Sequence, residues 1–324
     1  MTWRASAVNI VSTAIPCSIP SGLRILRAVS LEHPESGRVV PGEQIGLIGL
    51  GLMGNALAER LWQGGFEILG WDISPERRED LRRVGGRAAG SCDEVLAACL
   101  RVVLSLPNLE VVAQVLHEGD ASLRDGHLLV DTTTGSPKQA EALGKQLASR
   151  GIFYLDATVS GSSAQVRAGE VIVMAGGPRE VFQRCEDLFR CFARHAFHLG
   201  PCGSGAKMKL VTNLVLGLNR AALAEGLAFA EHLQLNLQET CAILRESMAY
   251  SRIMDTKGPK MLSGDFTPQA KLSQHLKDVR LILEAATKSG ARLPLTQTHK
   301  ELLAAAEAAG LGELDNSAIL EMFR

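Results

Sequence analysis

Between residues 44 and 177, short apolar runs alternate with segments of helical periodicity. In the helical segments apolar residues recur every three or four positions, as Met53, Leu57 and Leu61 do. The apolar runs fit short strands that are buried on both faces of a sheet. Strands are predicted at 44–49, 66–72, 101–106, 127–134, 151–159 and 170–177. Because these strands alternate with helices, the pattern predicts an α/β fold with a mostly parallel, doubly wound sheet.

The pattern changes near residue 205, beyond which it is helical and predicts no strand. Residues 206–233 are apolar on nearly all sides, but polar residues break the run of about 18 apolar residues that a membrane span needs. A helix of this kind in a soluble protein is buried on several sides, so we expect it to pack against both domains or against another subunit. The predicted units are an extension at 1–42, an α/β domain at 43–204 and an all-helical domain at 205–324 for substrate binding and oligomerisation.

A G-x-G-x-x-G sequence, formed by Gly49, Gly51 and Gly54, lies between the first strand and the first helix. This spacing alone is weak evidence, because 32 of the 324 residues are glycine. The context strengthens it, since strand, glycine turn, helix and second strand are followed by the acidic Asp72. Together they form the dinucleotide-binding fingerprint of a Rossmann domain.

Each residue of the fingerprint has a physical task. Gly49 permits the tight turn, Gly51 lets the backbone approach a pyrophosphate, and Gly54 allows the helix to pack closely on the strand. Asp72 would accept hydrogen bonds from ribose hydroxyls and repel a 2′-phosphate, which favours NAD over NADP. Arg77 and Arg78 follow closely and weaken this preference, so NADP remains possible.

The bulk composition excludes several classes of function. With 34 basic and 35 acidic residues, the chain gives no reason to expect a nucleic-acid or membrane partner. The seven cysteines form no C-x-x-C pair and the eight histidines show no ligand spacing. We therefore expect free thiols in a reducing compartment and no metal site.

Residues 1–31 differ in kind, with no Asp or Glu, three arginines and five serines. This composition is typical of an organelle transit segment, although a disordered extension or a wrongly assigned start codon would also account for it. The expected location is the cytoplasm, or the mitochondrial matrix if residues 1–42 are a transit segment.

A polar stripe follows the long apolar helix. Lys209, Asn213 and Arg220 lie within about 40° of one another when residues are placed 100° apart. Buried polar groups need partners, so these residues either pair internally or line a cleft between the domains where substrate meets cofactor. For Lys209 and Asn213 the cleft is favoured, because hydride transfer needs a proton donor. For Arg220 both interpretations stay open.

Several ordered segments together resemble the β-hydroxyacid dehydrogenase family, which includes 3-hydroxyisobutyrate dehydrogenase and tartronate semialdehyde reductase. They are the glycine loop "GLIGLGLMGNALAERL", the strand-end segments "LPN", "DTTTGSP" and "DATVSGSSAQVRAG", the helix start "GSGAKMKLVTN", and "HLKDVRL". The resemblance runs in order from about residue 44 to "LGELDNSAIL" near the C-terminus.

The resemblance implies roles for matched residues. Lys209 matches the catalytic lysine, and Asn213 matches the substrate-binding asparagine. Ser160, Gly161 and Ser162 match the loop that binds the substrate carboxylate, although many members have a second glycine where this chain has Ser162. The residues matched to cofactor contacts are Gly49, Gly51, Leu52, Met53, Gly54, Asp72, Leu106, Pro107, Thr134 and Lys277.

The implied activity is reversible hydride transfer between NAD(P) and a short 3-hydroxy acid, in an enzyme that forms a homodimer or homotetramer. An imine reductase on the same scaffold is an alternative, but Lys209 argues against it. A non-catalytic NAD(P)-binding scaffold is the other alternative. The sequence leaves the identity of the hydroxy acid open.

Overall fold

The computed structural model describes residues 29–30 and 42–324, so nearly all of the extension predicted at 1–42 lies outside the described residues. Nine strands form one sheet in the order β1-β9-β8-β7-β6-β5-β2-β3-β4. The strands are β1 (Val29–Ser30), β2 (Gln44–Ile48), β3 (Glu67–Trp71), β4 (Arg87–Ala88), β5 (Arg101–Leu104), β6 (Leu128–Asp131), β7 (Phe153–Ser160), β8 (Val171–Gly176) and β9 (Ala193–His198). Six of the eight strand pairs are parallel, which confirms the predicted sheet type.

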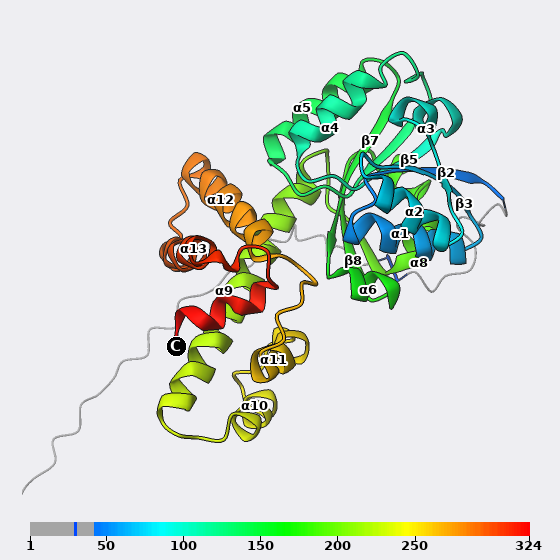
Figure 1. The fold of residues 1–324 in the computed structure, drawn as a ribbon. Helices are drawn as coiled ribbons and strands as arrows, with labels where there is room; N and C mark the ends of the chain where they lie inside the picture. Colours follow the sequence, from blue (N-terminus) through cyan, green and yellow to red (C-terminus); the bar gives the residue numbers. More distant parts are fainter. Residues whose placement is uncertain (1–28, 31–41) are drawn as a thin grey trace, which may run out of the picture.

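Helices cover both faces of this sheet, as the doubly wound prediction requires (Figure 1). They are α1 (Leu52–Gln63), α2 (Pro75–Arg83), α3 (Cys92–Ala98), α4 (Leu109–Glu118), α5 (Pro137–Ala148), α6 (Ser163–Arg167), α7 (Arg179–Gln183) and α8 (Glu186–Phe192). Leu61 of α1 and Phe189 of α8 belong to one buried apolar cluster. Val95 of α3 and Leu147 of α5 belong to a second one.

Two features of the sheet differ from the expected alternation. β7 and β8 run antiparallel, because the ten residues between them, 161–170, are too few to cross the sheet and return in parallel. β9 was not predicted, since Arg194 and His195 interrupt its apolar pattern. It forms a strand because β8 and β1 pair with its two edges.

The rest of the chain is helical, as predicted. Its elements are α9 (Ser204–His232), α10 (Leu237–Glu246), α11 (Ile253–Ser263), α12 (Leu272–Ser289), α13 (Pro294–Ala306), a π-helical segment (Glu307–Leu311) and a 3₁₀ helix (Asn316–Met322). In Figure 1 the long helix α9 runs away from the sheet, and the later helices surround its far part. α9 contacts β7 and β8 as well as α10, α11, α12 and α13.

The arrangement of α9 explains why its sequence is apolar on nearly all sides. Its first half packs on the sheet and its second half forms the centre of the third apolar cluster, with residues such as Leu223 and Leu227. Within residues 29–30 and 42–324, no helix is long and apolar enough to cross a membrane.

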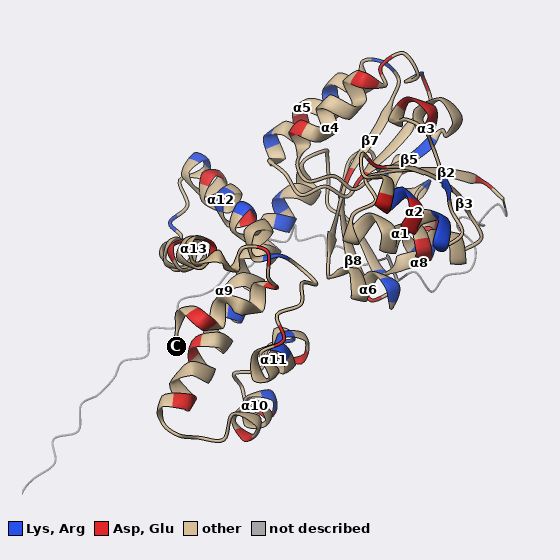
Figure 2. Cartoon of the chain, in the orientation of Figure 1, with Lys and Arg blue, Asp and Glu red and all other residues tan. Residues whose placement is uncertain are grey.

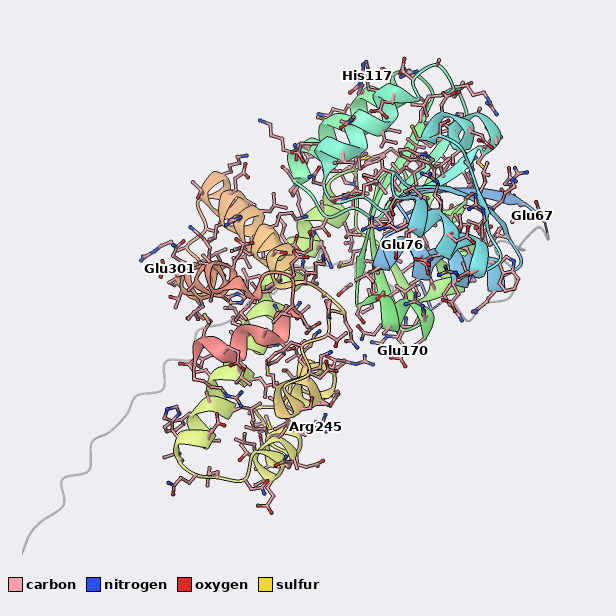
Figure 3. All side chains as sticks on the ribbon, in the orientation of Figure 1. Glu67, Glu76, His117, Glu170, Arg245 and Glu301 are labelled. Carbon is pink, nitrogen blue, oxygen red and sulfur yellow. The ribbon has the colours of Figure 1, made fainter. Side chains whose placement is uncertain are left out.

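Charged residues lie mainly on the outside of the molecule. Figure 2 shows basic and acidic residues interspersed over both the sheet and the helical part. Side chains such as His117 on α4 and Glu301 on α13 extend outward into solvent (Figure 3). The buried charges discussed below are therefore exceptions that need partners.

Candidate functional site

The glycine turn between β2 and α1 has the geometry that the fingerprint predicts. Gly49 has a φ of 92°, and a Cβ there would lie 2.3 Å from the Ser105 carbonyl oxygen. A Cβ on Gly54 would lie 1.9 Å from the Gly49 carbonyl oxygen. Both positions therefore require glycine for the packing of the protein itself.

Gly51 is different, because the protein leaves space beside it. The nearest atom to a Cβ on Gly51 is the Arg77 Nη1, at 3.8 Å. Protein packing therefore does not require glycine here. A ligand that approaches the backbone closely would require it, and the phosphates of a dinucleotide are ligands of this kind.

Asp72 lies directly after β3 and beside the glycine turn. It is buried, and its Oδ2 accepts a hydrogen bond of 2.8 Å from the Leu50 backbone N–H. Its Oδ1 accepts one of 2.9 Å from the Ser74 N–H. The Arg77 guanidinium lies 3.4 Å from Oδ2, and Arg78 donates to the Asp72 backbone carbonyl. The carboxylate therefore holds the turn in place with the Arg77 cation beside it, and the Arg78 cation binds the backbone of the same residue.

The predicted cofactor contacts at the ends of β5 and β6 also come together. Lys277 of α12 donates hydrogen bonds of 3.1 Å to the backbone carbonyls of Pro107 and Thr134. The Leu106 N–H donates to the Thr133 hydroxyl at 3.1 Å. At the start of α1, Leu52 is exposed, whereas Met53 is half-buried against the first apolar cluster.

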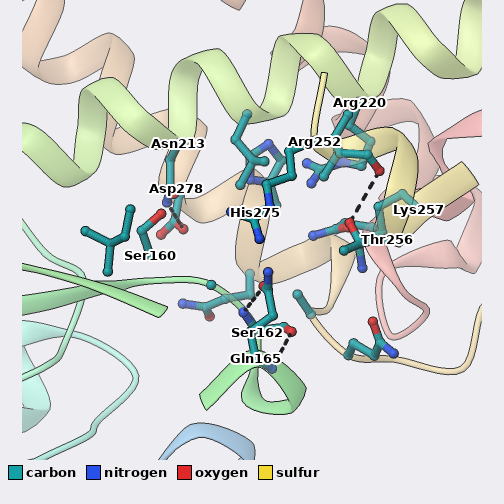
Figure 4. A pocket seen from close by; sticks show the side chains of 18 of the residues that line it. Ser160, Ser162, Gln165, Asn213, Arg220, Arg252, Thr256, Lys257, His275 and Asp278 are labelled. Carbon is teal, nitrogen blue, oxygen red and sulfur yellow. Dashed lines mark hydrogen bonds between the residues drawn. The ribbon is translucent and has the colours of Figure 1, made fainter. Parts of the chain in front are cut away.

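A cavity of about 290 Å³ lies between the end of β7 and the helices α9, α11 and α12. All five residues predicted for catalysis and substrate binding line it, namely Ser160, Gly161, Ser162, Lys209 and Asn213. Figure 4 shows the cavity with Ser160, Asn213 and Asp278 toward one end. Residues that are far apart in the sequence therefore face the same space.

Lys209 is nine-tenths buried in this cavity. Its Nζ donates a hydrogen bond of 2.6 Å to the Val159 carbonyl oxygen, at the end of β7. Burial lowers the pKa of the Lys209 ammonium below its ordinary value; Asp278 opposes this change and Lys277 adds to it. The side chain is thus held in one place, and its proton is easier to remove than that of a lysine in water.

Asp278 connects the other polar residues of the site. The Asn213 Nδ2 donates a hydrogen bond of 2.9 Å to the Asp278 Oδ2, and the Lys277 Nζ lies 3.3 Å from the Oδ1. Burial raises the pKa of this carboxyl, against the opposing pull of Lys277 and Lys209. The carboxylate therefore orients the amide of Asn213 and supplies negative charge between two lysines.

The serine loop has a constrained backbone. Gly161 has a φ of 145°, and a Cβ there would lie 2.6 Å from the Val171 Cγ1. Ser162 begins helix α6, where its hydroxyl accepts from the Gln165 N–H and its own N–H donates to the Gln165 side chain. Ser162 therefore fits a position where a second glycine would also fit, because its side chain serves as the helix cap.

Asp156 of β7 fixes the start of α9 and so places Lys209. Its two carboxylate oxygens accept hydrogen bonds of 2.8 Å from the N–H groups of Gly203 and Ala206. The carboxylate thus caps the helix across a sequence separation of 47 residues or more. Burial raises the pKa of Asp156 to about 6, and the backbone hydrogen bonds oppose that change.

Several residues of the site were not assigned from the sequence, namely Asp156, Lys257, His275, Asp278 and His299. Asp278 and His275 stood in the quoted segment "HLKDVRL". A usable signal was present there, because both interrupt the buried stripe formed by Leu272, Leu276 and Val279 on α12. Asp156 gave no such signal, because its partners lie far along the chain.

Arg220, for which two interpretations were open, lines the cavity and is 1% exposed. Its Nε and Nη2 have no hydrogen-bond partner among the described residues. Burial lowers the pKa of its guanidinium to about 10, against the opposing charge of Asp315. The internal pairing that would have explained a structural arginine is therefore incomplete.

Two family models match the chain in succession. The one described as the NAD binding domain of 6-phosphogluconate dehydrogenase matches residues 44–200. The one described as NAD-binding of NADP-dependent 3-hydroxyisobutyrate dehydrogenase matches residues 203–323.

Individual proteins match over nearly the same span. An L-threonate dehydrogenase from Cupriavidus necator is 32% identical, over 86% of this chain and 95% of the relative. A 2-(hydroxymethyl)glutarate dehydrogenase from Eubacterium barkeri is 31% identical, over 86% of this chain and 94% of the relative. The crystal structure of a 3-hydroxyisobutyrate dehydrogenase from Salmonella typhimurium superposes with a TM-score of 0.81 at 27% identity, over 87% of this chain and 100% of that one.

Proposed function

The chain belongs to the β-hydroxyacid dehydrogenase family, and from this membership we propose that it interconverts a short 3-hydroxy acid and its semialdehyde with NAD(P). One observation carries the proposal. Lys209, Asn213 and the serine loop line the same cavity, and the glycine turn after β2 leaves the backbone of Gly51 open to a ligand. The bound cofactor supplies the hydride during reduction and accepts it during oxidation.

Lys209 is proposed as the acid and base of the reaction. During reduction its ammonium donates a proton to the carbonyl oxygen, which gains negative charge and becomes the hydroxyl of the product. During oxidation the neutral amine removes the proton from that hydroxyl. The hydrogen bond to the Val159 carbonyl holds the Nζ for both directions, and the lowered pKa eases the proton transfer during oxidation.

The remaining polar residues orient the substrate. The Ser160 hydroxyl and the backbone of Gly161 are proposed to bind its carboxylate, together with Ser162. Asn213 is proposed to hold its oxygen near Lys209, with its amide fixed by Asp278. Lys277 joins α12 to the ends of β5 and β6, so it keeps the two parts of the site in register.

For the cofactor, the residues present fit a dinucleotide, and Asp72 supports a preference for NAD. The carboxylate lies at the end of β3, where a ribose would meet it. Arg77 and Arg78 lie beside it and would favour a 2′-phosphate. A comparison of kcat/KM for NADH and NADPH measures the balance, and Asp72→Asn should move it toward NADPH.

The proposal places the dinucleotide-binding domain at residues 43–204 and the substrate and oligomerisation domain at 205–324. A homodimer or homotetramer is supported by apolar side chains that are exposed in the single chain, among them Val211, Val215 and Phe229 on α9. Light scattering on the purified protein tests this. The six described cysteines are free, which supports a reducing compartment such as the cytoplasm.

The testing experiment measures NADH oxidation, with NADPH in parallel, against a panel of short semialdehydes. Lys209→Ala should lower kcat by about 10²- to 10⁴-fold, the usual contribution of a positioned acid. NADH binding by the variant, measured by fluorescence, shows that it is folded. If the wild-type protein binds NADH and turns over no semialdehyde, the result favours the non-catalytic scaffold. If it reduces cyclic imines instead, the result favours the imine reductase.

A further inference from the structure

Arg220 extends the functional face of α9 beyond the residues with proposed roles. It lies on the same face as Lys209 and Asn213, seven residues after Asn213, or about 10 Å farther along the helix axis. All three line the cavity. In Figure 4 Ser160, Asn213 and Asp278 lie on one side of His275, and Arg220, Thr256 and Lys257 lie on the other. The cavity therefore has a second polar end.

The charge of Arg220 is not neutralised by the described residues. The carboxylate that acts on it, Asp315, already accepts hydrogen bonds of 2.8 and 2.9 Å from the Lys257 Nζ and one of 2.7 Å from the Ser317 hydroxyl. One carboxylate therefore faces two buried cations, and one positive charge remains. A buried charge of this kind destabilises the fold unless a partner compensates it.

The two histidines beside Arg220 cannot supply the missing charge. Burial lowers the pKa of His299 to about 4 and holds the pKa of His275 well below its usual value, and Arg220 adds to both shifts, so both rings are neutral at pH 7. The Nε2 atoms of both rings have no hydrogen-bond partner among the described residues. Of the two, His275 lines the cavity and offers a further polar contact at this end, and the His299 ring lies 5.2 Å from it.

Gly217 leaves the room that these two rings occupy. A Cβ there would lie 2.5 Å from the His275 Nε2 and 2.7 Å from the His299 Cε1. The small size of Gly217 therefore lets the two imidazoles pack beside Arg220, and together these residues form one buried polar group on α9, α12 and α13. None of the four is needed by the acid-base chemistry of Lys209.

The wall of the cavity as a whole carries more positive than negative charge. Its basic residues are Arg194, Lys209, Arg220, Arg252, Lys257 and Lys271, and its acidic residues are Glu170 and Asp278. Three of these basic residues have an ion-pair partner, since Arg252 pairs with Glu170, Lys257 with Asp315 and Lys271 with Glu313. Arg220 and the exposed Arg194 form no ion pair with a described residue, which favours a ligand with a second negative charge besides the carboxylate at the serine loop.

We propose that Arg220 forms a second anion-binding subsite, which takes a carboxylate or phosphate at the far end of the substrate. The preferred substrates are then 3-hydroxy acids with two anionic groups. This inference rests on the proposed function for the reaction at Lys209. The guanidinium suits the task because it binds an oxyanion with two parallel hydrogen bonds.

The experiment compares matched substrates. Diacids with a hydroxymethyl group on the carbon beside one carboxylate, and with the second carboxylate one, two or three methylenes away, are oxidised with NAD. Each is compared with its distal amide, and one chain length also with its distal phosphonate. The wild-type enzyme should prefer the best dianion over its amide by about 30-fold in kcat/KM, the effect of one buried charged hydrogen-bond pair.

The variants assign the preference to Arg220. Arg220→Met should reduce the ratio of kcat/KM for dianion and amide to about one, and Arg220→Lys should retain part of it, because charge remains and the fork is lost. Lys271→Gln is the matched control. It removes a positive charge from the same wall, but that charge is exposed and paired with Glu313, so the ratio should stay as in the wild type.

The outcomes separate the subsite from the reaction. A wild-type enzyme that oxidises the amides as well as the diacids overturns the subsite and leaves the proposed function standing. An Arg220→Met variant that loses activity on both equally, with an unchanged ratio, also overturns it. If no hydroxy acid is oxidised, the proposed function fails, and the melting temperature of the protein is measured with glutarate and with its monoamide. Stabilisation by glutarate alone, lost in Arg220→Met, supports the subsite. Equal stabilisation by the two compounds overturns the subsite as well.

Discussion

Gly51 and Gly54 are three residues apart, and the structure predicts that alanine has opposite consequences at the two positions. At Gly54 an added Cβ would lie 1.9 Å from the Gly49 carbonyl oxygen and 2.9 Å from its carbon. These are backbone atoms of a tight turn and cannot move away as a flexible side chain would. We expect Gly54→Ala to lower the free energy of unfolding by about 3 kcal/mol, the upper end for overpacking.

At Gly51 the only atoms of the described residues within 4 Å of an added Cβ are in the Arg77 guanidinium, at 3.8 and 4.0 Å. The backbone has a φ of −63° and a ψ of −168°, which alanine adopts without strain. Alanine reduces the entropy of the unfolded chain but is a poorer helix cap than glycine, so the two effects nearly cancel. The free energy of unfolding should change by less than about 1 kcal/mol.

NADH binding should be weakened by Gly51→Ala, although this variant is nearly as stable as the wild type. The methyl group of Gly51→Ala would stand where the backbone meets the pyrophosphate, so the Kd for NADH should rise about tenfold or more, or about 1.4 kcal/mol. The assays are urea unfolding followed by circular dichroism and NADH titration followed by fluorescence. If Gly51→Ala binds NADH as the wild type does, or Gly54→Ala is as stable as the wild type, the assignment of the turn is refuted.

Three further predictions concern buried charges. The rate of oxidation should rise with pH to a plateau with a midpoint below 10.5, as the Lys209 ammonium loses its proton, and the rate of reduction should fall over the same range. Asp278→Asn should move this midpoint to lower pH, because Asp278 raises the pKa of Lys209, and Lys277→Met should move it to higher pH, because Lys277 lowers that pKa. Initial rates measured across pH check both shifts. Asp156→Ala should lower the free energy of unfolding by about 2 to 4 kcal/mol, because two N–H groups at the start of α9 lose their acceptor, and Asp156→Asn by less, as measured in urea. Lys257→Met should lower the free energy of unfolding by about 3 to 5 kcal/mol near pH 7, because the buried Asp315 carboxylate loses its paired cation. Burial raises the pKa of Asp315, but Lys257 opposes burial and holds this pKa at about 2, below its value in the unfolded chain. The loss of stability in Lys257→Met is therefore fully present above about pH 4 and shrinks as the pH falls toward 2.

Each of these has an outcome that contradicts it. If the midpoint of the pH profile moves in the same direction in Asp278→Asn and in Lys277→Met, the titrating group is not Lys209. An unfolding curve for Asp156→Ala that overlays the wild type would mean that water replaces the cap. A pH-independent loss in Lys257→Met would show that the pair contributes packing rather than charge.

Much of the fold followed from the sequence, because its signals are local. Periodicity placed β2, β3, β5, β6, β7 and β8, and the spacing of Gly49, Gly51, Gly54 and Asp72 identified the turn between β2 and α1. Each depends on residues within about thirty positions of one another, where chain geometry leaves few alternatives. The stripe of Lys209, Asn213 and Arg220 was equally readable, since a helix fixes the angle between its own residues.

The tertiary structure decided which of these residues have partners. That Asp156 caps α9, that Asp278 holds Asn213, and that Asp315 is already occupied by Lys257 all depend on contacts between elements far apart in the chain. The sequence shows that Arg220 is polar on a buried helix, but only the packing shows that two of its nitrogens lack a hydrogen-bond partner among the described residues and that Asp315, the carboxylate nearby, is shared with Lys257. Burial and pairing are properties of the space around a residue, and a local pattern does not contain that space.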